Sequence, residues 1–335
     1  MFGNQVSAHL SVPNGMDPPL HTPFRQLVEG FFTTEQMDAF APVCREIAAG
    51  LVRGFAPGDP AAPVDAVAGL GLPYAARVQC RFLGWPVEME AALLEWADRN
   101  LRAIRDLDRP ALAENARRFE DLGLGELRRR RETGAGGDLT ALLLRRRIDG
   151  RPLTDAEMVS LLRNWTAGEI GTISASVGIL VHFLAARPDV QAELRAQPGR
   201  IPAAIGELLR LRGPLLTNRR RTRCPVRVGD TLIPADAPVT LHWAAADRDP
   251  RAFPDPLVFR PDRAPDRSLL FGAGIHVCPG EPLARLELRL LLEELLAQIP
   301  SFAPDPGRPS RPAEFPLGGY ADVWIRLHPA IRPPS

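Results

Sequence analysis

The longest apolar pattern in the chain runs from Asp155 to Ala186, where hydrophobic residues cover most of the circumference of a helix. Thr154 and Glu157 stand at its start with the spacing of a capping box, and Pro188 follows its end. Because a helix that is apolar on most sides has no face for water, it has to cross the interior. The pattern therefore predicts one long central helix.

Shorter amphipathic stretches surround this helix in the sequence and predict further helices. We expect them at residues 33–47, 91–104, 114–132, 139–147, 201–212 and 282–299. The pattern changes at Arg223, after which Val226–Val228 and Thr231–Ile233 alternate around Gly229-Asp230, a hairpin signal. A further strand is expected at 238–243, and residues 249–265 lack periodicity. The predicted fold class is mainly α, with small β-sheets near the C-terminal half.

Composition narrows the class of protein. The 335 residues carry a net charge of +1 and contain no lysine, so no overall charge draws the chain to nucleic acid or to acidic membranes. Residues 1–19 lack a basic stretch followed by an apolar run, so we expect no leader or membrane anchor. The four cysteines are widely spaced and form no CxxC pair, which favours free thiols and a cytoplasmic location.

The candidate chemistry is concentrated at residues 271–280, Phe-Gly-Ala-Gly-Ile-His-Val-Cys-Pro-Gly, directly before the last predicted helix. Cys278 stands near a helix N-terminus, where the helix dipole and free N–H groups favour a thiolate. Gly272 and Gly280 let the backbone approach a flat ligand, and Phe271 can shield the sulfur from water. An anionic sulfur in an apolar pocket is a strong donor to haem iron.

This segment, followed by Leu283-Ala284-Arg285, resembles the haem-binding loop of the cytochrome P450 family. The resemblance implies a P450-like fold, haem b as cofactor, and Cys278 as the ligand of its iron. It also implies that Phe271, Gly272, His276 and Gly280 contact the cofactor.

Further segments resemble the same family in the same order. Glu207 and Arg210 match its Glu-x-x-Arg motif, which implies a buried pair that braces the haem loop. Residues 248–259 resemble the segment that precedes the loop, but Val258 stands where the family often has arginine. The third member of the charge cluster is therefore left open between Arg260, Arg263 and neither.

Basic residues at four separate places are expected to bind the haem propionates. Residues 17–25 resemble the start of the family's helix C, in which His21 and Arg25 lie one turn apart. Arg220 and His276 match two more propionate-binding positions. Charge-assisted hydrogen bonds from these four side chains would fix the cofactor.

The oxygen-activation motif departs from the family pattern. The segment Ala167-Gly168-Glu169-Ile170-Gly171-Thr172 carries Ile170 and Gly171 where an acid and a threonine are usual. Ala167 and Gly168 are expected to border the cofactor. Glu169 and Thr172 are three apart, so they could form a displaced proton relay if the glycines allow the helix to unwind locally.

Only 16 residues precede the first matching segment. We divide the chain into residues 1–16, a short irregular segment, and 17–335, a haem domain that lacks most of the usual N-terminal sheet and capping region. Either the start site is misassigned or the chain is a shortened form.

The leading functional hypothesis is a monooxygenase that inserts one atom of O2 into a hydrophobic organic substrate. Electrons would come from a separate ferredoxin and ferredoxin reductase, docking near Cys278 where Arg285 could meet acidic residues. The expected apolar wall of the pocket consists of Ile170, Ile173, Leu215 and Leu216. Two alternatives remain: a truncated haem-binding pseudoenzyme without turnover, and a peroxide-driven variant.

Overall fold

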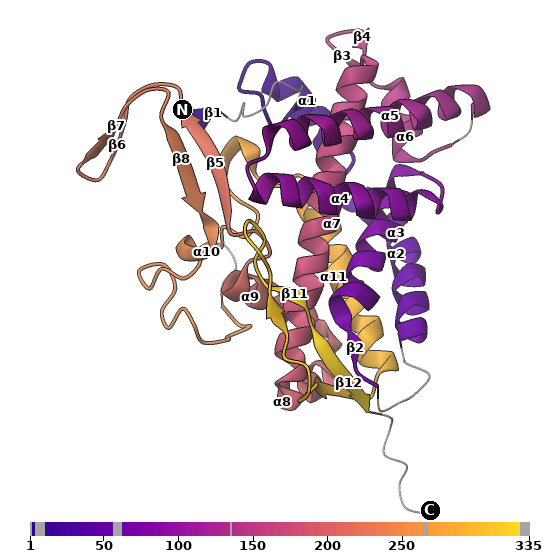
Figure 1. Cartoon of the computed structure of the whole chain (residues 1–335), viewed down its shortest axis with the longest axis vertical. Coiled ribbons are helices and arrows are strands. Elements are labelled where there is room, and N and C mark those ends of the chain that lie inside the picture. The colour runs from indigo at the N-terminus through magenta and orange to yellow at the C-terminus, as the bar shows by residue number, and fades with distance from the viewer. Residues whose placement is uncertain (1, 4–10, 56–61, 135, 264–266, 329–335) are drawn as a thin grey trace, which may run out of the picture.

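Helix α7 (Asp155–Ala185) runs through the middle of the molecule, and the other helices are arranged around it (Figure 1). The computed structural model describes residues 2–3, 11–55, 62–134, 136–263 and 267–328. The predicted capping box is present, because Thr154 accepts from the Glu157 amide while the Glu157 carboxylate accepts from the Thr154 amide. The central-helix prediction is confirmed.

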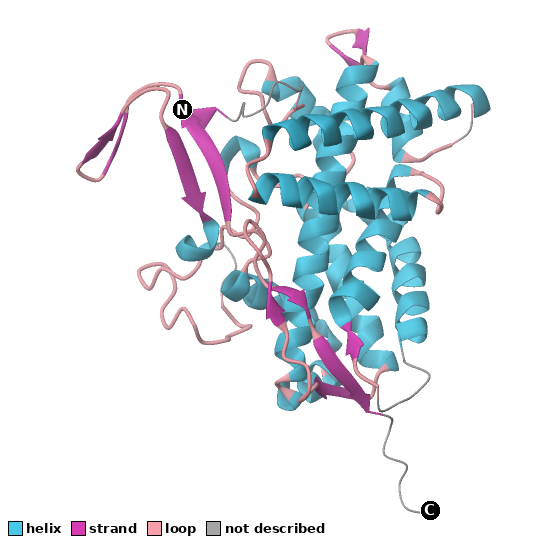
Figure 2. Ribbon diagram, viewed as in Figure 1, coloured by secondary structure: helices cyan, strands magenta, loops and turns pink. Residues whose placement is uncertain are grey.

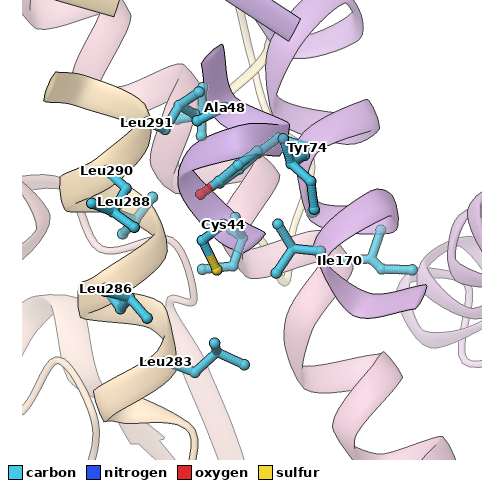
Figure 3. Packing of buried hydrophobic residues seen from close by; sticks show 14 of the residues in the cluster. Cys44, Ala48, Tyr74, Ile170, Leu283, Leu286, Leu288, Leu290 and Leu291 are labelled. Carbon is cyan, nitrogen blue, oxygen red and sulfur yellow. The ribbon is translucent and has the colours of Figure 1, made fainter. Parts of the chain in front are cut away.

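Helices α3 (Leu72–Leu83) and α11 (Glu281–Gln298) pack against this axis, and α2 (Thr34–Phe55) packs against both of them. Their facing side chains form the main core. Figure 3 shows leucines of α11 on one side of this core and Cys44, Ala48 and Tyr74 on the other. Burial of these apolar surfaces supplies most of the drive to fold.

The remaining helices cover this core. They are α1 (His21–Glu29), α4 (Met89–Arg105), α5 (Arg109–Thr133), α6 (Leu139–Arg145), α8 (Pro188–Ala196), α9 (Ile201–Arg212) and α10 (Trp243–Ala246), with short turns of other helix types at Val67–Gly71, Pro198–Arg200 and Gly274–His276. Helix α5 begins five residues before its predicted start, because Asp108 caps it through the Ala111 amide. Pro188 opens α8 as well as following α7.

Strands lie at the periphery of the helices (Figure 2). The sheets are β1-β5-β8, β2-β12-β9, β10-β11, β3-β4 and β6-β7. Their strands are β1 (Phe2–Gly3), β2 (Val64–Asp65), β3 (Arg147–Ile148), β4 (Arg151–Pro152), β5 (Thr217–Thr222), β6 (Val226–Val228), β7 (Thr231–Ile233), β8 (Pro238–His242), β9 (Ser301–Pro304), β10 (Arg311–Pro312), β11 (Tyr320–Asp322) and β12 (Trp324–His328).

The predicted hairpin is confirmed, since Val226 pairs with Ile233 and Val228 with Thr231. The mainly α class with small sheets is confirmed as well. The four C-terminal strands were not predicted. Helix α6 ends two residues before its predicted end, because Arg147 and Ile148 pair with β4 instead.

By length and composition α7 could span a membrane, and it is the one such helix among the described residues. Of its most apolar 18-residue window, 61% is buried inside the protein. This degree of burial is typical of the core helix that the pattern predicts.

Candidate active site

A cavity of about 310 Å³ lies between α7, α11 and the loop that precedes α11. Its walls include Gly168, Glu169 and Thr172 of α7, together with Leu283 and Leu288 of α11. From the loop come the lining residues Leu270, Phe271, Gly272, Ala273, His276, Cys278, Pro279 and Gly280. The segment singled out by the sequence therefore faces the one helix predicted to cross the interior.

The loop folds back on itself so that its cysteine points into this cavity. The Cys278 amide donates to the Phe271 carbonyl at 2.8 Å, which closes the turn. Gly272 and Gly274 have φ values of 75° and 74°, a region that strongly favours glycine. The Cys278 side chain is free and its exposed surface lines the cavity, and a Cβ on Gly280 would lie 3.8 Å from its sulfur.

The protonation of Cys278 differs from the sequence-based expectation. Burial raises the pKa of its thiol to about 11, and the hydrogen bond from Gly280 that opposes this shift is the weaker effect. Helix α11 begins only at Glu281, three positions after the sulfur. The helix N-terminus therefore does not ionise the thiol by itself, and a cation beside the sulfur is needed to stabilise the thiolate.

Basic side chains gather at one edge of the cavity around His276. The His276 and His21 rings meet edge to face at 4.7 Å, and an Arg25 guanidinium nitrogen donates to the Val277 carbonyl at 2.5 Å. Arg25 and Arg220 both lie close enough to lower the pKa of His276, although burial lowers it most. The structure thus brings together all four residues predicted to bind propionates.

Two of these four residues border the cavity and two lie behind them. His276 and Arg220 line the wall, whereas His21 and Arg25 are not among the lining residues. Asp17, which sequence analysis did not single out as a site residue, stands in the cluster with an oxygen 4.0 Å from His276 Nε2 and 3.3 Å from Arg223.

Unpartnered polar atoms provide a test of whether the expected haem fits. The Nε2 atoms of His21 and His276 are both buried without a hydrogen-bond partner. Because buried polar atoms are normally paired, these nitrogens beside Arg220 suit an anionic group such as a propionate. Among the described residues no three His, Cys, Asp or Glu side chains cluster as a metal site. A lone cysteine suits an iron already held by a porphyrin, so the residues present fit haem b.

An ionic cluster formed by Glu207, Arg210 and Arg263 lies behind the loop. Glu207 and Arg210 pair at 2.7 Å with side chains 3% exposed, as the motif predicts. The Arg263 guanidinium joins at 3.0 Å, whereas Arg260 reaches Glu207 only through its backbone amide. The open alternative is therefore resolved in favour of the Arg263 side chain.

Asp247 connects this cluster to the loop and was missed from the sequence. Its carbonyl accepts from Arg210 at 2.6 Å, while its carboxylate accepts from the Leu269 amide at 2.7 Å and from Ser268 at 3.3 Å. The ionic cluster thus braces the start of the loop through one intermediate residue.

The predicted relay on α7 has a different geometry from the one expected. The helix is α-helical throughout, with no local unwinding, and the Thr172 hydroxyl donates to the Gly168 carbonyl at 2.5 Å. Glu169 and Thr172 both line the cavity, and the Thr172 hydroxyl also donates to the Glu169 backbone carbonyl at 3.4 Å, but no hydrogen bond joins the two side chains. Glu169 instead faces Glu287 of α11, a residue that sequence analysis did not consider.

The structure places three of the residues expected to border the cofactor or the pocket away from the cavity lining. Ala167 is exposed on α7 but is not a lining residue, because adjacent helix positions point about 100° apart. Ile170 is 1% exposed within the core, and Leu216 does not line the cavity either. Ile173 and Leu215 do line it as expected.

The described end of the N-terminal segment also contributes to the cavity. The Val12 amide donates to Ser160 Oγ at 2.8 Å, and the Asn164 amide donates to the Val12 carbonyl at 2.9 Å. Pro13 and Asn14 then line the cavity. Residues 11–16 thus supply part of the cap that sequence analysis expected to be largely absent, whereas residues 4–10 lie outside the described part of the chain.

Comparisons with known proteins agree with this geometry. The model of the cytochrome P450 family matches residues 201–315. The chain is 35% identical over 284 residues to cyclomarin C epoxidase CymV of Salinispora arenicola, covering 84% of this chain and 71% of that protein. It is 33% identical over 293 residues to 6-deoxyerythronolide B hydroxylase of Saccharopolyspora erythraea, covering 86% and 70%.

A solved structure shows the same architecture. The structure of CYP109E1 from Bacillus megaterium in complex with testosterone matches with a TM-score of 0.86 and 26% identity. The match covers 97% of this chain and 88% of that one. The likeness includes both the helical core and the peripheral sheets.

Proposed function

The chain belongs to the cytochrome P450 family, and from that premise we propose that it inserts one oxygen atom from O2 into a hydrophobic organic substrate. The observation that carries the proposal is the Cys278 thiol, which is free and lines a cavity beside two buried, unpartnered histidine nitrogens. Together these groups offer a ligand for haem iron and contacts for the acidic edge of the porphyrin.

When haem b is bound, its thiolate-ligated iron activates O2 for insertion into the substrate. Cys278 would hold the iron, while His276 and Arg220 would bind the propionates and His21 and Arg25 would support them. Gly168, Phe271, Gly272 and Gly280 would border the macrocycle, and Ala167 would have only an indirect role. The ionic cluster would keep the loop in place without touching the cofactor.

Proton supply to the cavity is assigned to Glu169, with Thr172 beside it. Glu169 borders the cavity, and burial raises the pKa of its carboxyl to about 7, so it can release a proton near neutral pH. The Thr172 hydroxyl, which donates to Gly168, keeps its lone pairs available to a proton donor. A Thr172→Val variant should therefore consume electrons with less product, as seen by comparing NAD(P)H oxidation with product formed.

The substrate and the electron donors are assigned by class. Phe32, Phe82, Ile173 and Leu215 make much of the wall apolar, which favours a hydrophobic substrate. We propose a ferredoxin and its reductase as donors, sharing the cytoplasm with the enzyme. They would dock near the loop, where Arg285 lies over the Phe271 ring at 5.0 Å.

A reduced carbon monoxide difference spectrum tests the proposal most directly. We expect the absorption typical of thiolate ligation, and its loss in Cys278→Ser. If the purified protein binds no haem when it is supplied, or if Cys278→Ser leaves the spectrum unchanged, the proposal is wrong.

A peroxide-driven reaction is a second candidate, favoured by the absence of a side-chain hydrogen bond between Glu169 and Thr172. Supplying either ferredoxin, reductase and NAD(P)H or peroxide alone separates the two. Product with the electron chain supports the monooxygenase, and product with peroxide alone supports the second candidate. No turnover in either case indicates a haem-binding pseudoenzyme.

A further inference from the structure

Two glutamates on neighbouring helices form a carboxyl pair, Glu169 of α7 and Glu287 of α11. Glu287 is 0% exposed, whereas Glu169 is partly exposed where it borders the cavity. Their side chains lie within hydrogen-bonding reach of each other. Two buried acids in contact cannot both ionise at low cost, because like charges repel strongly where water is excluded.

The hydrogen-bond inventory of the pair points the same way. Glu169 Oε1 and both carboxyl oxygens of Glu287 are buried and receive no hydrogen bond from any described group. An ionised carboxylate can only accept hydrogen bonds. If both glutamates are ionised, neither can donate to the other, and these oxygens stay without partners. A proton on one carboxyl turns it into a donor to the other, and this single hydrogen bond gives a partner to two of the three oxygens.

Among the described residues, the titratable groups whose pKa shifts involve the pair do not supply a positive charge. Cys44 of α2, Tyr74 of α3 and Cys278 of the loop are the other titratable groups close enough to interact with the pair, and none is cationic. The Tyr74 hydroxyl points toward α11 (Figure 3), where it donates to the backbone carbonyl of Glu287 at 3.0 Å and not to the carboxyl.

Arg45, a cation that acts on the neighbouring Tyr74, is already paired. Arg45 reaches Tyr74 electrostatically, but its guanidinium bonds Glu293 at 2.6 Å and Glu294 at 2.8 Å. No arginine contributes to the pKa shift of either Glu169 or Glu287. The negative charge of the pair therefore has to be limited by a proton.

We propose that Glu287 is a positioning residue for Glu169: its protonated carboxyl donates a hydrogen bond that holds Glu169 as the cavity-facing member of a proton-sharing pair. Burial and the neighbouring Glu169 raise the pKa of Glu287 well above its ordinary value. Burial raises the pKa of Glu169 to about 7, and the hydrogen bond from Glu287 limits that rise. When Glu169 gives its proton to the cavity, the resulting carboxylate keeps the Glu287 hydrogen bond.

This inference rests on the proposed function only where it assigns the Glu169 proton to the chemistry in the cavity. The pair itself is tested by infrared spectroscopy of the purified haem-loaded protein across a pH series, in H2O and in D2O. A protonated carboxyl has a C=O stretching band that shifts in D2O and disappears on ionisation. We expect two such bands, one that titrates near neutral pH and one that persists well above it.

The variants assign these bands. Glu287→Gln should abolish the persistent band, yet leave the titrating midpoint of Glu169 close to that of the wild type, because the amide still donates. Glu287→Leu removes the donor and should raise that midpoint by about one pH unit or more. Glu169→Gln should abolish the titrating band.

A matched control is Glu126→Gln, because Glu126 is also buried, at 7% exposure, but is ion-paired with Arg129 at 2.6 Å. It should change neither band. If the wild type and Glu287→Gln have the same bands above neutral pH, or if Glu287→Leu leaves the Glu169 midpoint in place, Glu287 does not have this role. A loss of thiolate absorption in the carbon monoxide spectrum with both bands intact would instead overturn only the proposed function.

Discussion

Two buried acidic centres flank the cavity, and they handle negative charge in opposite ways. In the ionic cluster, Glu207 is surrounded by two guanidinium groups and an amide donor. In the carboxyl pair, Glu169 and Glu287 face each other without a cation. The ionic cluster keeps its charge and acts as a fixed brace, whereas the carboxyl pair lowers its charge by holding a proton. A buried acid therefore contributes to rigidity where cations surround it and to proton exchange where another acid faces it.

Breaking the ionic cluster should have the largest effect. Arg210→Leu leaves Glu207 buried with only Arg263 as a counter-charge and removes the hydrogen bond to Asp247. We expect a loss of about 3–5 kcal/mol in the free energy of unfolding, measured by urea denaturation. Arg102→Leu is the control, because the Arg102–Asp98 pair has side chains 65% and 55% exposed. Arg102→Leu should lower the free energy of unfolding by less than about 1 kcal/mol. Equal losses in the two variants would show that the buried cluster is no stronger a brace than an exposed pair.

The carboxyl pair should reveal itself through pH. Burial raises the pKa of Glu169 from 4.5 to about 7, so its stabilising contribution is complete below pH 4.5 and is lost as the pH rises through 7. The Glu169→Gln variant does not lose stability in this way, because a glutamine side chain does not ionise. Thermal unfolding should show similar melting temperatures for the variant and the wild type near pH 4.5, and a variant several degrees more stable at pH 8. A difference that does not depend on pH would show that folding does not raise the pKa of Glu169.

Within the ionic cluster, Arg263 should matter less than Arg210. Its guanidinium donates to Glu207 at 3.0 Å, but its side chain is 12% exposed, so water can replace part of the interaction. Arg263→Ala should therefore lower the free energy of unfolding by about 2 kcal/mol. A loss as large as that of Arg210→Leu would mean that the three residues act as one indivisible unit.

Arg260 should matter least, although it is nearer to the position where the family often has arginine. It reaches Glu207 through its backbone amide, and its guanidinium forms an exposed pair with Asp255 at 2.7 Å. Arg260→Ala keeps the amide, so the unfolding free energy should change by less than about 1 kcal/mol. A larger loss would assign to Arg260 the role that the geometry gives to Arg263.

The structural features that could be predicted from the sequence are those that depend on a local pattern of residues. The capping box, the hairpin and the glycine-rich loop each involve residues close together in the chain, so their spacing determines their geometry. The choice between Arg260 and Arg263 depended on an irregular segment that meets α9 only in three dimensions, and no periodicity describes such a segment. The shorter α6 likewise reflects strand pairing that helix propensity does not contain.

The carboxyl pair was missed for a related reason. An acidic residue on a helix normally faces water, and its partner on another helix cannot be found from one sequence. A signal was nevertheless present, because Glu287 stands between Leu286 and Leu288 in a leucine-rich run. Glu169, which the relay hypothesis named, lines the cavity, but the hypothesis assumed an unwound helix where the structure has a regular one.

The turn at residues 11–16 has a consequence for how the enzyme could diversify. Its position on α7 depends on Ser160 and Asn164, which hold both backbone groups of Val12, while the cavity meets Pro13 and Asn14. Replacing either polar side chain would let this turn shift without altering any atom near the sulfur. Selection for new substrates could therefore act on Ser160 and Asn164, which hold the turn, and leave the reactive centre unchanged.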